Sequence, residues 1–256
     1  MNTFATQNEK KMQKTTEEPL LKERSPRAAL SAGFRLYTGN FRHFLKSTWL
    51  MALVTSLICG ATATVIFIYW PELLARAYSN LPNAWQLAGQ YYMLLTAIIV
   101  LTVLSFIAII IFWGFGGSAL IKIHQKRKIS WWKALKIMIT RLFRISPRYW
   151  GRLFLVLLVS IIVLGILDLL VSTPEFLLWQ ANWQAHVGVV GGDDLGMPGY
   201  MTALTFITCA SVTFLQLYIW LTMLPALYFL YGGIMARKNN APKALNPSIQ
   251  SLNANL

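Results

Sequence analysis

Charged residues are scarce in this sequence. Asp, Glu, Lys and Arg make up 12% of the 256 residues, whereas soluble domains average about 25%. Apolar residues reach 56%. A chain with so few charges cannot cover a globular surface with polar side chains. The composition therefore excludes an ordinary soluble domain and predicts a protein whose apolar surface faces lipid.

Groups that perform catalysis or bind metals are also rare. Cys59 and Cys209 lie inside apolar runs, and the chain has no zinc-ligand spacing, P-loop, nucleophile elbow or HExxH motif. His43 and His124 lie among basic residues with no acid nearby, so neither has the surroundings of a general base. An enzyme acting on lipid would lack any recognisable catalytic group. We therefore expect no enzyme, no cofactor and no metal site.

The N-terminal segment lacks the apolar stretch of a secretory leader. Residues 1–24 are polar throughout, so we expect a disordered cytoplasmic tail and no cleavable signal peptide. Residues 239–256 are expected to form a second disordered cytoplasmic tail.

Four apolar runs are long enough to cross a bilayer, which takes about 20 helical residues. They cover residues 49–70, 92–121, 153–172 and 201–234. The second and fourth runs exceed the thickness of the hydrocarbon core, so we expect them to tilt or to project from it. Pro225 lies inside the fourth run and is expected to kink that helix. The predicted fold class is an all-α membrane protein with four transmembrane helices.

The basic residues are distributed unevenly around these runs. Nine of the 23 Lys and Arg lie in residues 1–48, ten lie in residues 122–152, and three lie in the C-terminal tail. The other two loops, 71–91 and 173–200, contain only Arg76. Because loops rich in Lys and Arg stay in the cytoplasm, both termini and the central loop are expected there. This asymmetry and the absence of N-glycosylation sequons favour a bacterial inner membrane.

Two basic segments beside the runs have the pattern of amphipathic helices. Residues 26–38 follow Ser25 and open with Pro26, a favourable N-cap and first helical residue. In residues 130–144, apolar side chains recur at helical spacing, at Trp131, Leu135, Ile139 and Leu142. Such basic helices lie among lipid headgroups. We expect contacts with anionic headgroups from Arg35, Arg42, Lys46, Lys133, Lys136, Arg141, Arg144, Arg148 and Arg152.

The alternative is that these bases only set topology and stop transfer through the membrane. The net charge of +14 would also suit a nucleic-acid partner. The bases, however, flank apolar runs and do not form a separate soluble domain. No nucleic-acid partner is therefore expected.

Three short motifs recur in the same order in the two halves of the chain. Arg35-Leu36-Tyr37 matches Arg141-Leu142-Phe143, Pro-Glu pairs follow the first and third runs, and aromatic residues with a Gly-Gly pair end the second and fourth. The recurrence predicts an internal duplication of residues 25–121 and 122–238, each an interfacial helix followed by a transmembrane hairpin. Both halves begin on the same side, so they would be parallel repeats. The alternative is convergence, because interfaces generally favour aromatic and basic residues.

Small residues lie at places where helices could approach one another closely. In lipid, close backbone contact is a main source of helix association. We expect helix packing, within the chain or in a homo-oligomer, at Gly60, Gly114, Gly116, Gly117, Gly232 and Gly233. The alternative role for the glycine pairs is a hinge.

Asp168 is the only acidic residue inside an apolar run. An intramembrane carboxylate is a functional candidate, for instance in ion or proton coupling. Its position near the end of the third run would also let it reach the interface or bond to a threonine of a neighbouring helix. Beyond that run, Trp179 and Trp183 are expected to belong to an aromatic belt, and His186 with two nearby acids is weak evidence for a metal.

These features favour a non-catalytic multi-pass membrane protein that interacts with lipids or assembles with itself or with another membrane protein. The alternative is a subunit of a small-molecule or ion transporter. Polar residues along the fourth run would suit that alternative, although threonines in such helices commonly bond to helix carbonyls. These residues are Thr202, Thr205, Thr208, Ser211 and Thr213.

Overall fold

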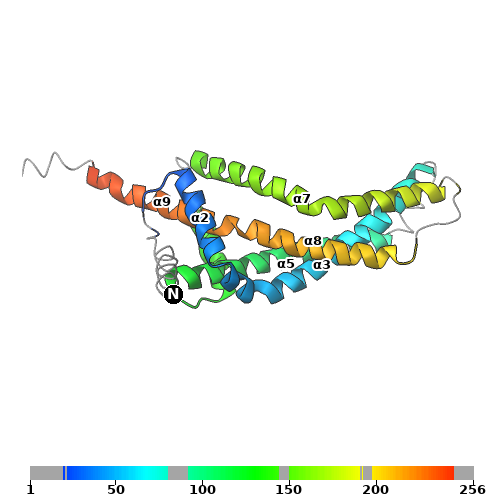
Figure 1. Cartoon of the computed structure of the whole chain (residues 1–256), viewed down its shortest axis with the longest axis horizontal. Helices are drawn as coiled ribbons and strands as arrows, with labels where there is room; N and C mark the ends of the chain where they lie inside the picture. Colours follow the sequence, from blue (N-terminus) through cyan, green and yellow to red (C-terminus); the bar gives the residue numbers. More distant parts are fainter. Residues whose placement is uncertain are drawn as a thin grey trace, which may run out of the picture. The chain divides into compact units, whose positions relative to one another are not determined.

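The computed structural model describes residues 20, 22–79, 92–143, 150–190, 192 and 198–244 of the chain. Within these residues the fold is all helical. The helices are α2 (Pro26–Gly39), α3 (Phe41–Ser79), α5 (Tyr92–Gln125), α6 (Trp131–Phe143), α7 (Trp150–Val190), α8 (Met201–Leu221) and α9 (Met223–Ala244) (Figure 1).

Four segments of the described chain are long and apolar enough to cross a membrane. They are Phe41–Pro71, Tyr92–Gln125, Leu153–Val189 and Met201–Arg237. They confirm the predicted multi-pass transmembrane architecture. Each segment contains one of the four apolar runs predicted from the sequence.

The first helix begins where the sequence predicts. The Ser25 hydroxyl accepts a hydrogen bond from the Ala28 backbone N–H at 3.3 Å, and Pro26 occupies the first turn, where no N–H is needed. After Gly39, the Asn40 side chain donates to the Leu36 carbonyl at 3.0 Å. That bond satisfies one of the free carbonyls at the helix end. The cap separates α2 from α3.

Two helices continue beyond the apolar runs that predicted them. α3 passes through Pro71 to Ser79, and α7 passes through Pro174 to Val190. The predictions that residues 71–91 and 173–200 form loops are therefore wrong as far as Ser79 and Val190. The C-terminal tail predicted from residue 239 is likewise helical as far as Ala244. A proline removes one backbone hydrogen bond of a helix. After Pro174 the chain is rich in Leu, Gln and Ala, which favour continued helix.

The fourth span is interrupted. A turn at Thr222 separates α8 from α9, three residues before Pro225. Proline has no N–H to donate, and its ring clashes with the carbonyl of the residue four positions earlier, which here is Leu221. The interruption lies close to the position where the sequence predicts a kink.

The chain divides into two compact units. Unit 1 comprises residues 1–47, 114–163 and 220–256, and unit 2 comprises residues 48–113 and 164–219. Each spanning segment contributes residues to both units. The sequence of unit 1 carries 22 bases and four acids, whereas that of unit 2 carries one base and five acids. The formal net charges are therefore +18 and −4.

In unit 1, α2 lies across α9 (Figure 1). Its buried face consists of Ala29, Gly33, Leu36 and Tyr37. Gly33 lies against the backbone of Pro225 and Ala226, so closely that an added Cβ would overlap it. The absence of a side chain at Gly33 is what lets these two helices touch.

In unit 2, small polar side chains join α3 to α5. The Thr62 hydroxyl lies 2.8 Å from the Ser105 hydroxyl, and the Thr55 hydroxyl donates to the Ala108 carbonyl at 3.3 Å. Packing with α8 follows the same principle, because a Cβ on Gly60 would lie 2.9 Å from Ala210. Small residues and interhelical hydrogen bonds are the usual means of helix association in lipid.

Candidate functional site: the basic helices and a polar seam

The inner face of α6 packs on the end of α5. The ring of Trp131 stacks on that of Phe115 with a centroid distance of 6.0 Å. A Cβ on Gly114 would lie 3.1 Å from the Trp131 ring, and one on Gly117 would lie 2.5 Å from the Met138 sulfur. The apolar stripe predicted for this helix is therefore only partly free to contact lipid, because Trp131 and its neighbours contact protein.

The outer face of α6 combines bases with large apolar side chains. Trp132 is 62% exposed and Ile139 is 48% exposed. They lie seven residues apart, which puts them on the same side of the helix. Lys133 and Lys136 are also exposed and lie next to them around the helix. This face has no covering element among the described residues of unit 1.

The outer face of α2 has a similar composition. Phe34 is 59% exposed, and both Arg27 and Arg35 are exposed. Seven residues separate Arg27 from Phe34, so they share one side of the helix, opposite the face that packs on α9. Each of the two short helices therefore buries one side and presents bases with an exposed aromatic residue on the other.

Arg141, predicted to contact headgroups, faces two aromatic rings of α9. Its guanidinium carbon lies 5.7 Å from the ring centroid of Tyr228 and 5.5 Å from that of Tyr231. These are cation–π distances. The Tyr228 hydroxyl accepts a hydrogen bond from the Gln125 side chain at 2.9 Å and lies 3.3 Å from His124 Nδ1. The cluster joins α5, α6 and α9.

Sequence reasoning missed a second basic residue in this role. Arg24 is buried, and its guanidinium carbon lies 4.8 Å from the ring centroid of Phe229. In the sequence, Arg24 is notable only as the residue before an N-cap, and that position does not indicate burial.

Arg42 and Lys46, which were predicted to contact headgroups, are exposed at the start of α3. Three other predicted bases lie outside the described side chains: Arg144, Arg148 and Arg152.

The glycines predicted to pack helices all lie close to other parts of the chain. Gly60 faces α8, Gly114 and Gly117 face α6, and Gly116 faces Leu221. The second pair packs on the segment before α2, with Gly232 against Leu20 and Gly233 against Arg24.

Asp168 lies near the middle of α7, because this helix continues to Val190. The expectation that it lies close to a helix end is therefore wrong. On α7, Asp168, Ser172, Glu175, Asn182 and His186 recur at intervals of three, four or seven residues. This spacing puts all five on one side of the helix. We call these residues, with Thr205 and Gln216 of α8, the polar seam.

Two hydrogen bonds connect the helices across the polar seam. Gln216 Nε2 donates to the Ser172 hydroxyl at 2.9 Å, and Asn182 Nδ2 donates to the Thr205 hydroxyl at 3.3 Å. Asn182 and Thr205 are fully buried. Thr205, one of the five polar residues predicted along the fourth span, thus bonds to a neighbouring helix.

Several buried polar atoms of the polar seam have no hydrogen-bond partner among the described residues. They are Asp168 Oδ1, Asn182 Oδ1 and His186 Nε2. A buried polar atom without a partner is unfavourable in any apolar surroundings. The threonine partner expected for Asp168 is not found in the described part of the chain.

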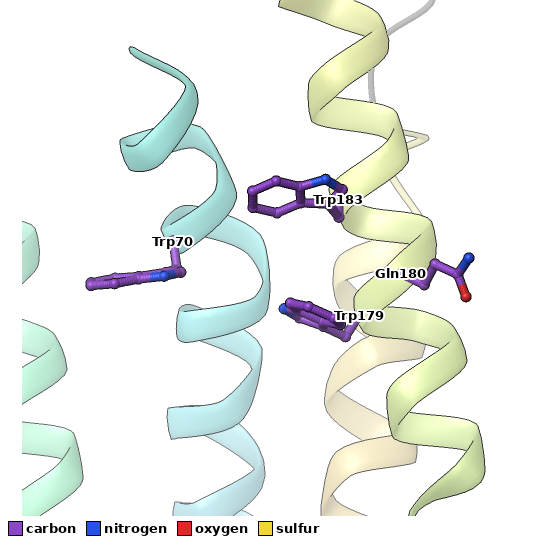
Figure 2. A pocket seen from close by; sticks show the side chains of 4 residues that line it. All are labelled: Trp70, Trp179, Gln180 and Trp183. Carbon is purple, nitrogen blue, oxygen red and sulfur yellow. The ribbon is translucent and has the colours of Figure 1, made fainter. Parts of the chain in front are cut away.

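A cavity of about 280 Å³ is lined by Trp70 of α3 and by Trp179, Gln180 and Trp183 of α7. Figure 2 shows Trp179 and Trp183 directed toward α3, while Gln180 projects from another side of α7 and the indole of Trp70 points away from α7. The three indoles do not surround a common centre, so the cavity lacks the form of an aromatic cage for a cation.

No group of three or more His, Cys, Asp or Glu that could hold a metal ion occurs among the described residues. Comparisons with protein-family models, with curated proteins and with solved structures find no match to this chain.

Proposed function

We propose that this protein is a non-catalytic multi-pass membrane protein that binds anionic lipid headgroups through the outer faces of α2 and α6. The observation that carries the proposal is the exposed combination of Lys133 and Lys136 with Trp132 and Ile139 on one short helix. Apolar side chains of such a helix enter the headgroup region, and bases bind phosphates.

The proposed orientation places unit 1 at the cytoplasmic side of a bacterial inner membrane, with both termini in the cytoplasm. The division of charge supports it, because 22 of the 23 bases lie in the sequence of unit 1. The positive-inside rule relates such an excess to the cytoplasmic side. The inner leaflet also carries anionic lipids, which attract each base by about 1 kcal/mol.

Reciprocal packing in unit 1 supports the proposed duplication. α2, from the first half, packs on α9 of the second half, while α6, from the second half, packs on α5 of the first. A pseudo-two-fold axis would relate these two contacts. The matched residues have nevertheless diverged, because Arg35 is exposed whereas Arg141 faces tyrosine rings.

The decisive experiment measures lipid retention. The full-length protein is purified gently into nanodiscs containing anionic and zwitterionic lipid, and bound lipid is counted by native mass spectrometry. Replacing Lys133 and Lys136 with Gln removes two bases, or about 2 kcal/mol of attraction, which corresponds to a roughly thirtyfold loss of affinity for anionic lipid.

The matched control removes two exposed bases from the loop that precedes α6, as Lys126→Gln with Lys128→Gln. We expect this control to retain more anionic lipid than the α6 variant, because the loop has no exposed Trp132 or Ile139 beside its bases. Equal losses in the two variants would mean that net charge alone attracts lipid, and would refute a role for the α6 face.

The alternative function, a subunit of a small-molecule or ion transporter, is favoured by one specific observation. The polar seam places ionisable and amide side chains inside two candidate spans. Intramembrane polar residues commonly mark ion pathways. Flux measured in proteoliposomes tests this alternative separately from lipid retention.

A further inference from the structure

The polar seam contains two carboxyl groups that the lipid-binding proposal does not use. Asp168 and Glu175 lie on the same side of α7. Two helical turns, or about 10 Å, separate their backbone positions. Ser172 lies one turn from each, and Gln216 of α8 donates to its hydroxyl. A hydroxyl and an amide thus lie between the two acids.

No basic side chain neutralises these acids among the described residues. The only Lys or Arg in the sequence of unit 2 is Arg76, whose side chain lies outside the described residues. The other titratable side chains along the polar seam are His186 on α7 and the buried Cys209 on α8. Among the described residues, neither carboxylate therefore has a fixed cation beside it.

A second and independent observation concerns the surroundings of the acids. Asn182 is fully buried, donates across the seam to Thr205, and leaves its carbonyl oxygen without a partner. Asp168 Oδ1 and His186 Nε2 are likewise buried and unpaired. A buried carboxylate oxygen without a donor is unfavourable. A bound proton removes the charge of such a carboxylate and supplies a polar hydrogen at that carboxyl group, and water bound along the seam is the donor that suits Asn182 Oδ1.

We propose that the polar seam between α7 and α8 binds one proton inside the membrane, on Asp168 or on Glu175. The proton comes from water and adds to a carboxylate oxygen, which converts one carboxylate to a carboxylic acid. Release reverses this step, and no electron is transferred. Ionisation of both acids would place two like charges on one side of a membrane span, whereas one proton removes that repulsion.

A divalent metal ion fits this position less well. No set of three or more His, Cys, Asp or Glu capable of holding a metal lies among the described residues. The proposal goes beyond lipid binding and does not depend on it, because the seam lies in unit 2 and the basic helices lie in unit 1.

Infrared difference spectroscopy of the full-length protein in lipid nanodiscs tests the proposal. A protonated carboxyl group has a C=O stretching band that a carboxylate lacks. We expect the wild type to show this band at neutral pH and to lose it on strong alkalinisation. The double variant Asp168→Asn, Glu175→Gln should lack the band, whereas Glu23→Gln, which removes an acid near Arg237 in unit 1, should retain it.

A wild type without the band at neutral pH would overturn the proposal, and so would a band that persists in the double variant. A band that disappears when sodium replaces a large organic cation at constant pH would assign the site to sodium and would also overturn it. Should the double variant fail to fold, aspartate labelled with carbon-13 at its side-chain carboxyl gives a second measurement on the wild type. A shift of the band on labelling supports a proton on Asp168, and the absence of any shift refutes a role for Asp168.

Discussion

Replacing Gly33 with Ala tests the closest helix contact in unit 1. The new Cβ would lie 2.5 Å from Ala226 Cα and 2.8 Å from the Pro225 carbonyl carbon, and both atoms belong to the backbone of α9. The backbone nitrogen of Ala226 lies closer still and ordinary contact begins at 3.4 Å, so α2 has to retreat by about 1 Å. Overpacking of this kind costs about 1–3 kcal/mol. The better helix propensity of Ala offsets about 1 kcal/mol.

Gly39→Ala is the matched control, because Gly39 ends the same helix and a Cβ there would meet nothing within 4 Å. The difference between the two variants therefore isolates the steric effect, with a central value of about 2 kcal/mol. For a chain of this size that value lowers Tm by about 4–8 °C. Circular dichroism during heating, in nanodiscs of one lipid composition, measures the shift. Equal Tm values for Gly33→Ala and Gly39→Ala would refute the close packing of α2 on α9.

Two further variants test the surroundings of α6. Gly117→Leu should dissociate α6 from α5 and broaden the size-exclusion peak, because even a Cβ at this position lies 2.5 Å from the Met138 sulfur. Gly165→Leu, where a Cβ meets nothing within 4 Å, is the control, and identical elution of the two variants would contradict the contact. Tyr228→Phe should lose about 1 kcal/mol of stability, because the hydroxyl accepts from Gln125 at 2.9 Å. Thermal unfolding measures this loss, and an unchanged Tm would argue against that hydrogen bond.

The spans and the start of α2 could be predicted because their signals are local. Run length identified the four spans, and Ser25 with Pro26 identified a helix start. The extent of α7 could not be predicted, because a proline at the end of an apolar run resembles a boundary. The sequence therefore predicts a loop for the polar residues after Pro174. Because α7 is continuous, these residues align instead with Asp168 on one side of the helix.

The sequence also could not predict which residues the Arg141 side chain faces. Helical spacing places it among the bases of α6, and the rings that it faces belong to α9, almost 90 residues later in the sequence. A lysine or arginine at a helix edge can snorkel to water or stack on a ring. Which of the two occurs is decided by tertiary packing.

The separation of charge supplies a common physical reason for both proposals. The sequence of unit 1 carries a formal charge of +18, and that of unit 2 carries −4. Neither excess can be neutralised by ion pairs within its own unit. At a membrane surface, anionic headgroups compensate such bases. Inside a span neither headgroups nor counterions are at hand, and protonation is then the simplest way for an acid to lose its charge. Adding a base to the polar seam, as in Gln216→Lys, should therefore replace the proton and abolish the carboxylic-acid band at neutral pH.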